Sequence, residues 1–431
     1  IRYGLPYGSL LNPDEQSIVP RAWRMVHGGG PDPHWFDYPT LLMYVLAPFQ
    51  AWQHEPSYLA ARLVVAVLGV AGVGAAWWLG LRAYGRVAGA VAAAVVAVET
   101  THVLYSHMAV TDVPLTLGVT ISLALLVSGR LEWAGLAAGL ATGFKYPGIL
   151  LVVPLVVVGW GRWWRLAGSL VLTGAGFLAA SPYLAVHPAL AWHDASRVQR
   201  LARAGWLGFE HDHATPIAFL DRLWGGLGPV LIVAGAGLVV ALFRRNRADL
   251  ALASFALVYF LDLLTINAHF DRYVLPLVPV LGVMAGRLRS LAPVTLLLLV
   301  VPLAWSIQRV GTLKHEDTRI PAARWVASHL PAGTKVAVDS STPPLAGLRV
   351  VPLLLPGPGR LSDPNREIGR LRAQGVQAVV ITGAVEDRVL AARERYPRET
   401  RFLAELGRLR RLYRIDPGDG RSGPWVAVYH L

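Results

Sequence analysis

The sequence lacks cysteine altogether, which excludes disulfide bonds, thiolate metal sites and cysteine nucleophiles. It is also poor in charge: only 16% of its 431 residues are Asp, Glu, Lys or Arg, whereas 54% are hydrophobic. One soluble core does not need so much apolar surface. The composition therefore predicts a polytopic α-helical membrane protein.

Several motifs that mark nucleotide- and metal-dependent enzymes are also missing. There is no P-loop, no HExxH and no GxSxG, and the triple glycine at 28–30 is typical of a turn. The net charge of +13 would suit nucleic acid, but the basic residues before position 310 stand in short clusters between apolar runs. That arrangement suits membrane topology, so nucleic acid is not an expected partner.

Ten apolar runs are long enough to cross, or nearly cross, a bilayer. They occupy residues 59–81, 84–100, 109–128, 133–144, 147–160, 165–183, 223–243, 249–266, 273–286 and 291–308. The chain starts at Ile1 rather than Met, and residues 1–57 are expected outside. We therefore expect one further span upstream, which would make eleven.

The loops between these runs alternate in charge. One set is short and basic and contains Arg82, Arg86, Arg130, Arg162, Arg165, Arg244, Arg245, Arg247, Arg287 and Arg289. By the positive-inside rule these loops face the cytoplasm. The other set includes loops 1–57 and 184–222 and, with the chain after 310, holds all 13 histidines. This second set is expected to face outward.

After residue 310 the pattern becomes that of a soluble domain. Amphipathic helices are predicted at 321–330, 365–375 and 386–396, and strands at 335–339, 376–382 and 425–431. Their alternation predicts a small outward-facing α/β domain over 311–431, after a multi-span membrane domain over 1–310. No Gly-rich fingerprint follows its strands, so it is not interpreted as a cofactor domain.

Two adjacent carboxylates, Asp14 and Glu15, follow Asn12 and Pro13. An Asn cap, a proline and acids in the first turn make a strong helix start, so a structural role is one interpretation. The pair is also expected just outside the membrane, where a carboxylate can meet a lipid-borne substrate and accept a proton. Asp112, which opens an apolar run, has the same two interpretations.

The outward loop "GGGPDPHWFDYPTLLMY" contains His34 and Tyr38 among prolines and aromatic residues. Such a loop is stiff and offers flat surfaces on which sugars or prenyl chains pack, although an interfacial aromatic belt would look the same. The segment "EHDH" at 210–213 has the spacing of a metal site, but two histidines in a polar loop are usually just solvated.

Two cations, Lys145 and Arg272, lie on the side where the charge rule disfavours them. Lys145 could snorkel to the interface, and Asp271 could neutralise Arg272. Alternatively, both hold the phosphate of a lipid head group, for which a guanidinium fork is well suited. Tyr273 follows Arg272 directly and precedes a Pro-rich apolar run.

Five segments in this order resemble one family: "GLPYGSLLNPDE", "PHWFDYPTLLMYVLAP", "YSHMAVTDVPLTL", "GLATGFKYPGIL" and "DRYVLPLVPVLG". They are similar to bacterial GT-C glycosyltransferases of family 39, which are related to dolichyl-phosphate-mannose protein mannosyltransferases and aminoarabinose transferases. The resemblance covers the membrane part nearly end to end, and it lies in the order of the segments rather than in any single motif.

The resemblance implies an inverting glycosyltransferase of the bacterial cytoplasmic membrane. It would move a monosaccharide from a polyprenyl-phosphate lipid to an acceptor hydroxyl on the outer face. Asp14 would be the catalytic base, Glu15 would bind acceptor or metal, and Asp112 would match the later outward acid of the family. Arg272 and Tyr273, with Lys145, would lie at the lipid phosphate. A divalent metal ion and the nature of the acceptor, whether protein, lipid or glycan, remain open.

Two other classes fit a polytopic chain. A lipid-linked-sugar transporter or flippase would need interrupted spans, ionisable groups near mid-membrane and symmetric halves. A membrane assembly scaffold that has lost activity is the other alternative, against which the retained Asp14 argues.

Overall fold

The computed structural model describes all 431 residues and divides into two compact units. The first unit contains Ile1, Asp14–Gln199 and His213–Val310. The second contains Arg2–Pro13, Arg200–Asp212 and Gly311–Leu431. Two segments that precede residue 311 thus belong with the C-terminal part of the chain.

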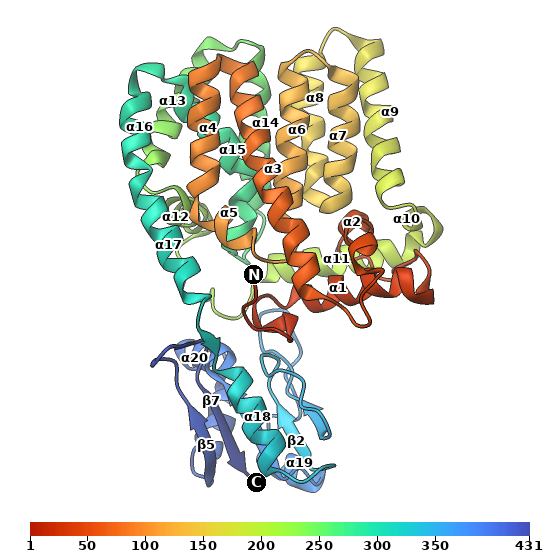
Figure 1. Cartoon of the computed structure of the whole chain (residues 1–431), viewed down its shortest axis with the longest axis vertical. Helices are drawn as coiled ribbons and strands as arrows, with labels where there is room; N and C mark the ends of the chain where they lie inside the picture. Colours follow the sequence, from red (N-terminus) through yellow and green to blue (C-terminus); the bar gives the residue numbers. More distant parts are fainter. The chain divides into compact units, whose positions relative to one another are not determined.

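Each of the ten apolar runs is largely helical and lies in the first unit (Figure 1). The helices are α3 (Tyr58–Tyr84), α4 (Arg86–Val98), α6 (Asp112–Val127), α7 (Leu131–Phe144), η3 (Tyr146–Leu151) with α8 (Val152–Gly159), α9 (Trp163–Ala180), α12 (Thr215–Leu227) with α13 (Val230–Arg244), α14 (Arg247–Leu263), η4 (Asp271–Leu277) with α15 (Val278–Arg287), and η5 (Arg289–Leu291) with α16 (Ala292–Leu298) and α17 (Val300–Thr312). Helix α7 packs on α6 and α9, α3 packs on α4 and α6, and α15 packs on α4 and α13.

Not every one of these helices is long enough to cross a bilayer alone. By length and hydropathy, two helices are long enough: Tyr58–Tyr84 and Arg289–Thr312. The helices α12 and α13 meet at a bend of 116° and would make a third if together they form one broken span. The 16 residues of α6 reach about 24 Å, short of a hydrocarbon core of about 30 Å. The helical membrane architecture agrees with the sequence, while the number of spans stays a prediction.

Close helix packing in this unit depends on small residues. A Cβ atom at Gly135 of α7 would lie 2.1 Å from the Ser169 carbonyl oxygen of α9, and one at Gly139 would lie 2.2 Å from that of Thr173. Only glycine allows the two backbones to approach so closely. This contact holds the C-terminal half of α7, and with it Lys145, in a defined place.

The short basic loops meet at one end of the unit. Arg82 Nε donates to Ser128 Oγ at 3.0 Å, and Arg165 reaches the neighbouring Gly129 carbonyl at 3.3 Å. The Tyr84 hydroxyl donates to Asp249 Oδ1 at 2.6 Å, next to Arg287. The sorting of loops expected from charge therefore agrees with their arrangement in space, although which side of a membrane they face stays a prediction.

Short helices cover the other end: α1 (Asp14–Arg24), the π-helix η2 (Met25–Gly29), α2 (Leu41–Gln50), α5 (Thr100–Tyr105), α10 (Tyr183–Val186) and α11 (Pro188–Ala204) (Figure 1). Helix α1 begins at Asp14, one residue after the expected first position Pro13, and carries Asp14 and Glu15 in its first turn as expected. Acids at this position interact favourably with the helix dipole.

The second unit contains a five-stranded sheet in the order β3-β2-β4-β7-β5. Its strands are β2 (Lys335–Val338), β3 (Arg349–Pro352), β4 (Ala378–Thr382), β5 (Arg411–Ile415) and β7 (Val426–His430). Strands β3, β2 and β4 are parallel, whereas β7 runs antiparallel to β4 and β5. A separate parallel pair joins β1 (Glu316–Asp317) to β6 (Arg421–Ser422).

Helices cover both faces of this sheet, and the central strand β4 is therefore buried throughout. Val379 and Ile381 pack with α19 (Ile368–Ala373) and α21 (Pro397–Leu406), while Ala378 and Val380 pack with α18 (Arg319–His329). Helix α20 (Gly383–Ala391) follows β4 directly. The predicted α/β domain is confirmed, but β3, β5 and α21 were not expected, since the two strands are at the sheet edges and carry exposed arginines.

Candidate active site

Two acids and two cations from four distant segments meet at the end of the first unit opposite the basic loops. Arg272 Nη1 lies 2.8 Å from Asp14 Oδ2, and its Nε lies 3.9 Å from Asp112 Oδ2. Lys145 Nζ lies 2.6 Å from Asp112 Oδ1. We call Asp14, Asp112, Lys145 and Arg272 the charge cluster.

Helix ends explain why these residue types occupy these places. Asp112 is the first residue of α6 and Lys145 directly follows the last residue of α7. The two helices pack side by side and are joined by a short loop at their other ends, so the acid at one N-terminus meets the cation at the neighbouring C-terminus. Both charges are favourable there, because the helix dipole is positive at the N-terminus and negative at the C-terminus.

Aromatic side chains surround the charge cluster. The Tyr38 hydroxyl donates to Asp14 Oδ2 at 3.0 Å, and Lys145 Nζ lies 4.7 Å from the centre of the Tyr273 ring and 5.9 Å from that of Tyr38. Arg272 lies 5.0 Å from the centre of the Phe270 ring. These rings limit access of water and stabilise the cations through their faces.

The members of the charge cluster differ in how far a substrate could reach them. The side chain of Asp14 is 25% exposed, whereas that of Asp112 is 3% exposed. Arg272 is buried, and its Nε has no hydrogen-bond partner. Asp14 is thus the accessible acid, and Arg272 keeps a donor that a bound anion could satisfy.

The sequence also suggested that the Asp271 carboxylate neutralises the Arg272 side chain, but in the structure this carboxylate binds other groups. Its Oδ1 accepts a hydrogen bond from the Tyr105 hydroxyl at 2.8 Å and from the backbone N–H of Arg272 at 2.8 Å. The Arg272 guanidinium is paired with Asp14 instead. Sequence reasoning missed Tyr105, which holds the loop that presents Arg272.

Glu15 lies away from the charge cluster and is fully buried. Arg62 of α3 donates to both of its oxygens, at 2.9 and 2.6 Å, and the Ala109 N–H donates to Oε1 at 2.7 Å. Both oxygens of Glu15 are therefore occupied by groups of the protein, and not by positions open to an acceptor or a metal ion. Since α1 turns about 100° per residue, adjacent residues point in different directions, and Glu15 faces the helices while Asp14 faces the cluster.

His34 lies in a second group, with Asp32 and His187. His187 Nε2 is 2.6 Å and His34 Nδ1 is 3.5 Å from Asp32 Oδ2, and one ligand atom of each residue lies within 4.8 Å of the others. Two imidazoles and a carboxylate suit a divalent transition metal such as Zn²⁺. Asp32 and His187 were not singled out from the sequence, because 155 residues separate them.

The "EHDH" segment does not form a comparable group. Glu210 accepts from the Tyr396 hydroxyl, His211 bonds the Ala391 carbonyl at 3.0 Å, and His213 lies 3.0 Å from Asp221. Each side chain thus has its own partner.

Comparisons with known proteins agree with a carbohydrate-transferring enzyme. The sequence profile described as glycosyltransferase family 87 matches residues 35–266. No curated protein matches the chain. The matched region contains Tyr38, Asp112 and Lys145 of the site described above.

Solved structures resemble the chain over most of its length. ArnT from Cupriavidus metallidurans in the apo state has a TM-score of 0.59 at 17% identity, covering 97% of this chain and 93% of ArnT. ArnT bound to undecaprenyl phosphate has a TM-score of 0.55 at the same identity and coverage. AglB, an oligosaccharyltransferase from Archaeoglobus fulgidus in complex with an inhibitory peptide and a dolichol-phosphate, has a TM-score of 0.57 at 12% identity, covering 87% of this chain and 65% of AglB.

These findings confirm the GT-C fold expected from the sequence. The matching family is 87, whereas the five segments were compared with family 39. The resemblance of the five segments thus led to the fold that the solved structures show, but to another family than the one that matches. Because the profile covers more than half of the chain, this membrane protein belongs to glycosyltransferase family 87.

Proposed function

We propose that the chain moves a monosaccharide from a polyprenyl-phosphate lipid to an acceptor hydroxyl on the outer face of the bacterial cytoplasmic membrane. The charge cluster is the observation that carries the proposal, because it combines an accessible acid with two buried cations. The relatives in structure add support, since ArnT was crystallised with undecaprenyl phosphate and AglB with a dolichol-phosphate.

Asp14 acts as the general base. Its carboxylate takes the proton of the acceptor hydroxyl while that oxygen forms a bond to the anomeric carbon of the sugar. The bond from that carbon to the lipid phosphate oxygen breaks on the opposite face, so the anomeric centre is inverted. The lipid phosphate leaves as a stable anion and needs no proton.

Arg272 and Lys145 stabilise the leaving phosphate. Negative charge develops on that group as the glycosidic bond breaks, and fixed cations in a dry site lower the barrier more than they would in water. Arg272 offers a buried Nε without a partner, in addition to the nitrogen now paired with Asp14. A phosphate that engages Arg272 weakens its pull on Asp14, which favours proton transfer to that acid.

The remaining predicted residues support these two steps. Tyr38 donates to Asp14 and Tyr273 lies against Lys145, so both orient the charged groups. Asp112 orients Lys145. Glu15 fixes α1 against α3 through Arg62, and a divalent ion at Asp32, His34 and His187 would connect the first outward loop with the start of α11.

A lipid-linked-sugar transporter is the second candidate. The bend of 116° between α12 and α13 is a broken helix of the kind that transporters contain. The charged residues of the site, however, lie at helix ends rather than in the middle of helices. Enzyme and transporter differ in whether the donor is chemically split.

The test measures release of polyprenyl phosphate by the purified full chain from a panel of undecaprenyl-phosphate monosaccharides. We expect turnover by the natural sequence and a loss on the order of 10³-fold for Asp14→Asn, within the range for a general base. The matched control is Asp37→Asn, since Asp37 of the same outward region is also paired with an arginine, Arg197. Near-normal transfer by folded Asp14→Asn would remove Asp14 as the base, and movement of intact donor across vesicles without cleavage would favour the transporter.

A further inference from the structure

The chain passes from the second unit into the first at the Pro13–Asp14 bond. Residues 2–13 cluster with Gly311–Leu431, whereas Asp14 is the first residue of α1 in the first unit. The residue just before the proposed base is therefore held by the C-terminal unit.

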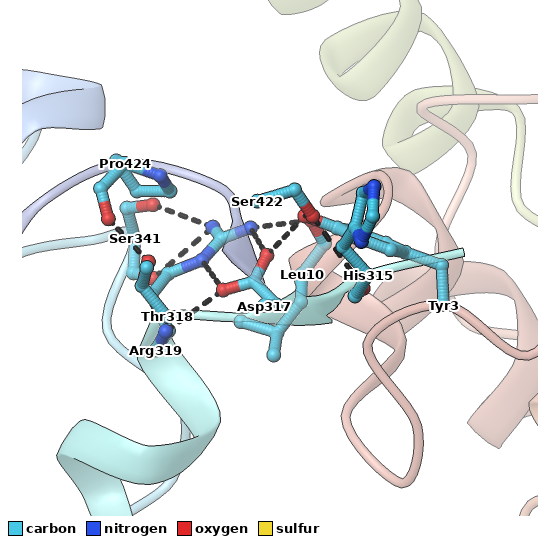
Figure 2. A network of polar contacts seen from close by, with 9 residues as sticks. All are labelled: Tyr3, Leu10, His315, Asp317, Thr318, Arg319, Ser341, Ser422 and Pro424. Carbon is cyan, nitrogen blue, oxygen red and sulfur yellow. Dashed lines mark hydrogen bonds and ion pairs between the residues drawn. The ribbon is translucent and has the colours of Figure 1, made fainter. Parts of the chain in front are cut away.

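An ion pair within the second unit holds this N-terminal segment (Figure 2). Arg319 Nη2 donates to the Leu10 carbonyl oxygen at 2.6 Å and to Asp317 Oδ2 at 2.6 Å, and Arg319 Nε donates to Asp317 Oδ1 at 2.8 Å. The Tyr3 hydroxyl donates to Asp317 Oδ2 at 2.6 Å. Burial raises the pKa of Tyr3 to about 12, so this hydroxyl keeps its proton.

Burying these charges is costly unless they do something that apolar residues cannot do. Asp317 is fully buried and Arg319 is 7% exposed. An apolar pair of similar size would often stabilise a domain equally well. It could not, however, bind a backbone carbonyl and a tyrosine hydroxyl of another segment, as Arg319 and Asp317 do. Arg319 Nη1 also donates to Ser341 Oγ at 2.9 Å, within the C-terminal segment.

The residue on the other side of Asp14 is fixed as firmly, but in the first unit. Glu15 is held by Arg62 and by the Ala109 N–H. Between the anchored Leu10 carbonyl and the anchored Glu15 lie four residues, 11 to 14, one of which is a proline. A stretch this short, which contains a proline and follows a held carbonyl group, has few conformations.

We propose that Arg319, together with Asp317, is a positioning residue for Asp14: by holding Leu10 it fixes the chain that enters α1. This inference rests on the proposed function of Asp14. Loss of the anchor lets the first turn of α1 fray, as helix ends do. The acid then spends less time beside Tyr38 and Arg272, which lowers turnover, while both cations that bind the lipid phosphate remain in the site.

The same unit contains a matched control pair. Arg366 lies 3.1 Å from Glu386, and the two residues are as deeply buried as Arg319 and Asp317. Arg366 also bonds the Leu354 carbonyl and lies over the Phe402 ring, all within the C-terminal segment. Breaking this pair perturbs the second unit without touching residues 2–13.

The experiment compares Arg319→Leu with Arg366→Leu in the full chain, using the most active donor of the panel. For Arg319→Leu we expect kcat to fall 10- to 100-fold, with no weaker binding of undecaprenyl phosphate alone; for folded Arg366→Leu we expect neither to change. Arg319→Lys should recover part of the loss. Because the chain has no cysteine, a spin label at Pro13→Cys reports on the segment directly. The spectrum should report a more mobile label when Arg319→Leu is added, and an unchanged mobility when Arg366→Leu is added.

Each result decides the inference. An unchanged kcat or an immobile label in folded Arg319→Leu overturns it, as does an equal loss in Arg366→Leu. If Arg319→Leu does not fold, Tyr3→Phe removes one contact of the same anchor and should give a smaller loss of kcat with a more mobile label. The proposed function fails separately, when Asp14→Asn itself keeps normal transfer.

Discussion

The two ends of the first unit both place arginines beside carboxylates, but they do so differently. At the basic end Arg287 pairs with Asp249 at 2.7 Å and Arg165 pairs with Glu132 at 2.6 Å, each joining neighbouring loops. At the other end Arg272 lies within 4 Å of two acids, Asp14 and Asp112, and Asp112 also holds Lys145.

At the basic end the charges connect neighbouring loops, whereas at the other end charges from several distant segments converge on one place. At the basic end no second acid lies beside Arg287 or Arg165, although Asp249 also accepts from the Tyr84 hydroxyl and Arg287 Nε has no hydrogen-bond partner. In the charge cluster each group depends on the others, so removing or engaging one changes the rest. A site is thus better recognised by convergence of several segments than by the presence of a salt bridge.

The largest expected contrast is in stability. Lys145→Met leaves buried Asp112 with only the more distant Arg272, 3.9 Å away, which should cost roughly 3 kcal/mol of unfolding free energy. Arg165→Met at the basic end breaks a pair whose side chains are 47% and 34% exposed, and should change the unfolding free energy far less, because water screens exposed ion pairs. Unfolding in detergent micelles measures both. Equal losses would show that the two ends do not differ, and Lys145→Met combined with Asp112→Leu should recover most of the stability.

Activity should distinguish two arginines of equal exposure. Arg272 and Arg287 are each 10% exposed and paired with an aspartate. Arg272→Gln should lower kcat by about 10²- to 10³-fold, because the leaving phosphate loses its cation. Arg287→Gln should leave the rate per folded molecule unchanged. A similar loss in both variants would assign the effect of Arg272 to structure alone.

A third buried pair, in the second unit, extends the comparison to pH. Burial raises the pKa of Glu386 to about 7, although Arg366 opposes the shift. The folded carboxyl thus stays protonated where the unfolded one, near 4.5, is ionised. Its stabilising contribution is present below about pH 4.5 and is lost as pH rises through about 7, on the order of 3 kcal/mol.

Hydrogen exchange of the β4 amides in the full chain, corrected for intrinsic rates, measures this effect. Protection should fall as pH rises through that range. Glu386→Gln should remove the dependence, since the amide does not titrate. A dependence that persists in this variant would locate the titrating group elsewhere.

The smallest effect concerns the metal-binding candidate at the same end as the charge cluster. Zn²⁺ at a few times its dissociation constant should stabilise the protein by about 1 kcal/mol. His187→Ala should abolish the gain in thermal stability. His213→Ala is the control, because His213 faces a single carboxylate, Asp221, rather than two further ligands. Stabilisation that survives in His187→Ala would exclude this group as the site.

Much of the fold could be predicted because its signals are local. Apolar length identified the helices, and the charge rule sorted the loops that the structure gathers at one end. The start of α1 followed from Asn12, Pro13 and the two acids. The edge strands β3 and β5 escaped prediction because their arginines interrupt the apolar alternation that marks a strand.

The site could be predicted only in part. Asp14, Tyr38, Asp112, Lys145, Arg272 and Tyr273 were singled out and do lie together. Glu15 was included although it faces Arg62, because two adjacent acids look alike in a sequence until the helix face is known. Asp32 and His187, and the Arg319 anchor of residues 2–13, join segments so distant that no spacing rule relates them.

Local sequence signals set where helices form and which loops carry charge, because the cost of placing charge in apolar surroundings depends on the residue and its neighbours along the chain. Long-range packing sets which acid meets which cation, and it places the segment before Asp14 in the C-terminal unit. Those outcomes depend on how helices and segments distant in sequence pack together, and a difference of one position turns a side chain by about 100° around its helix.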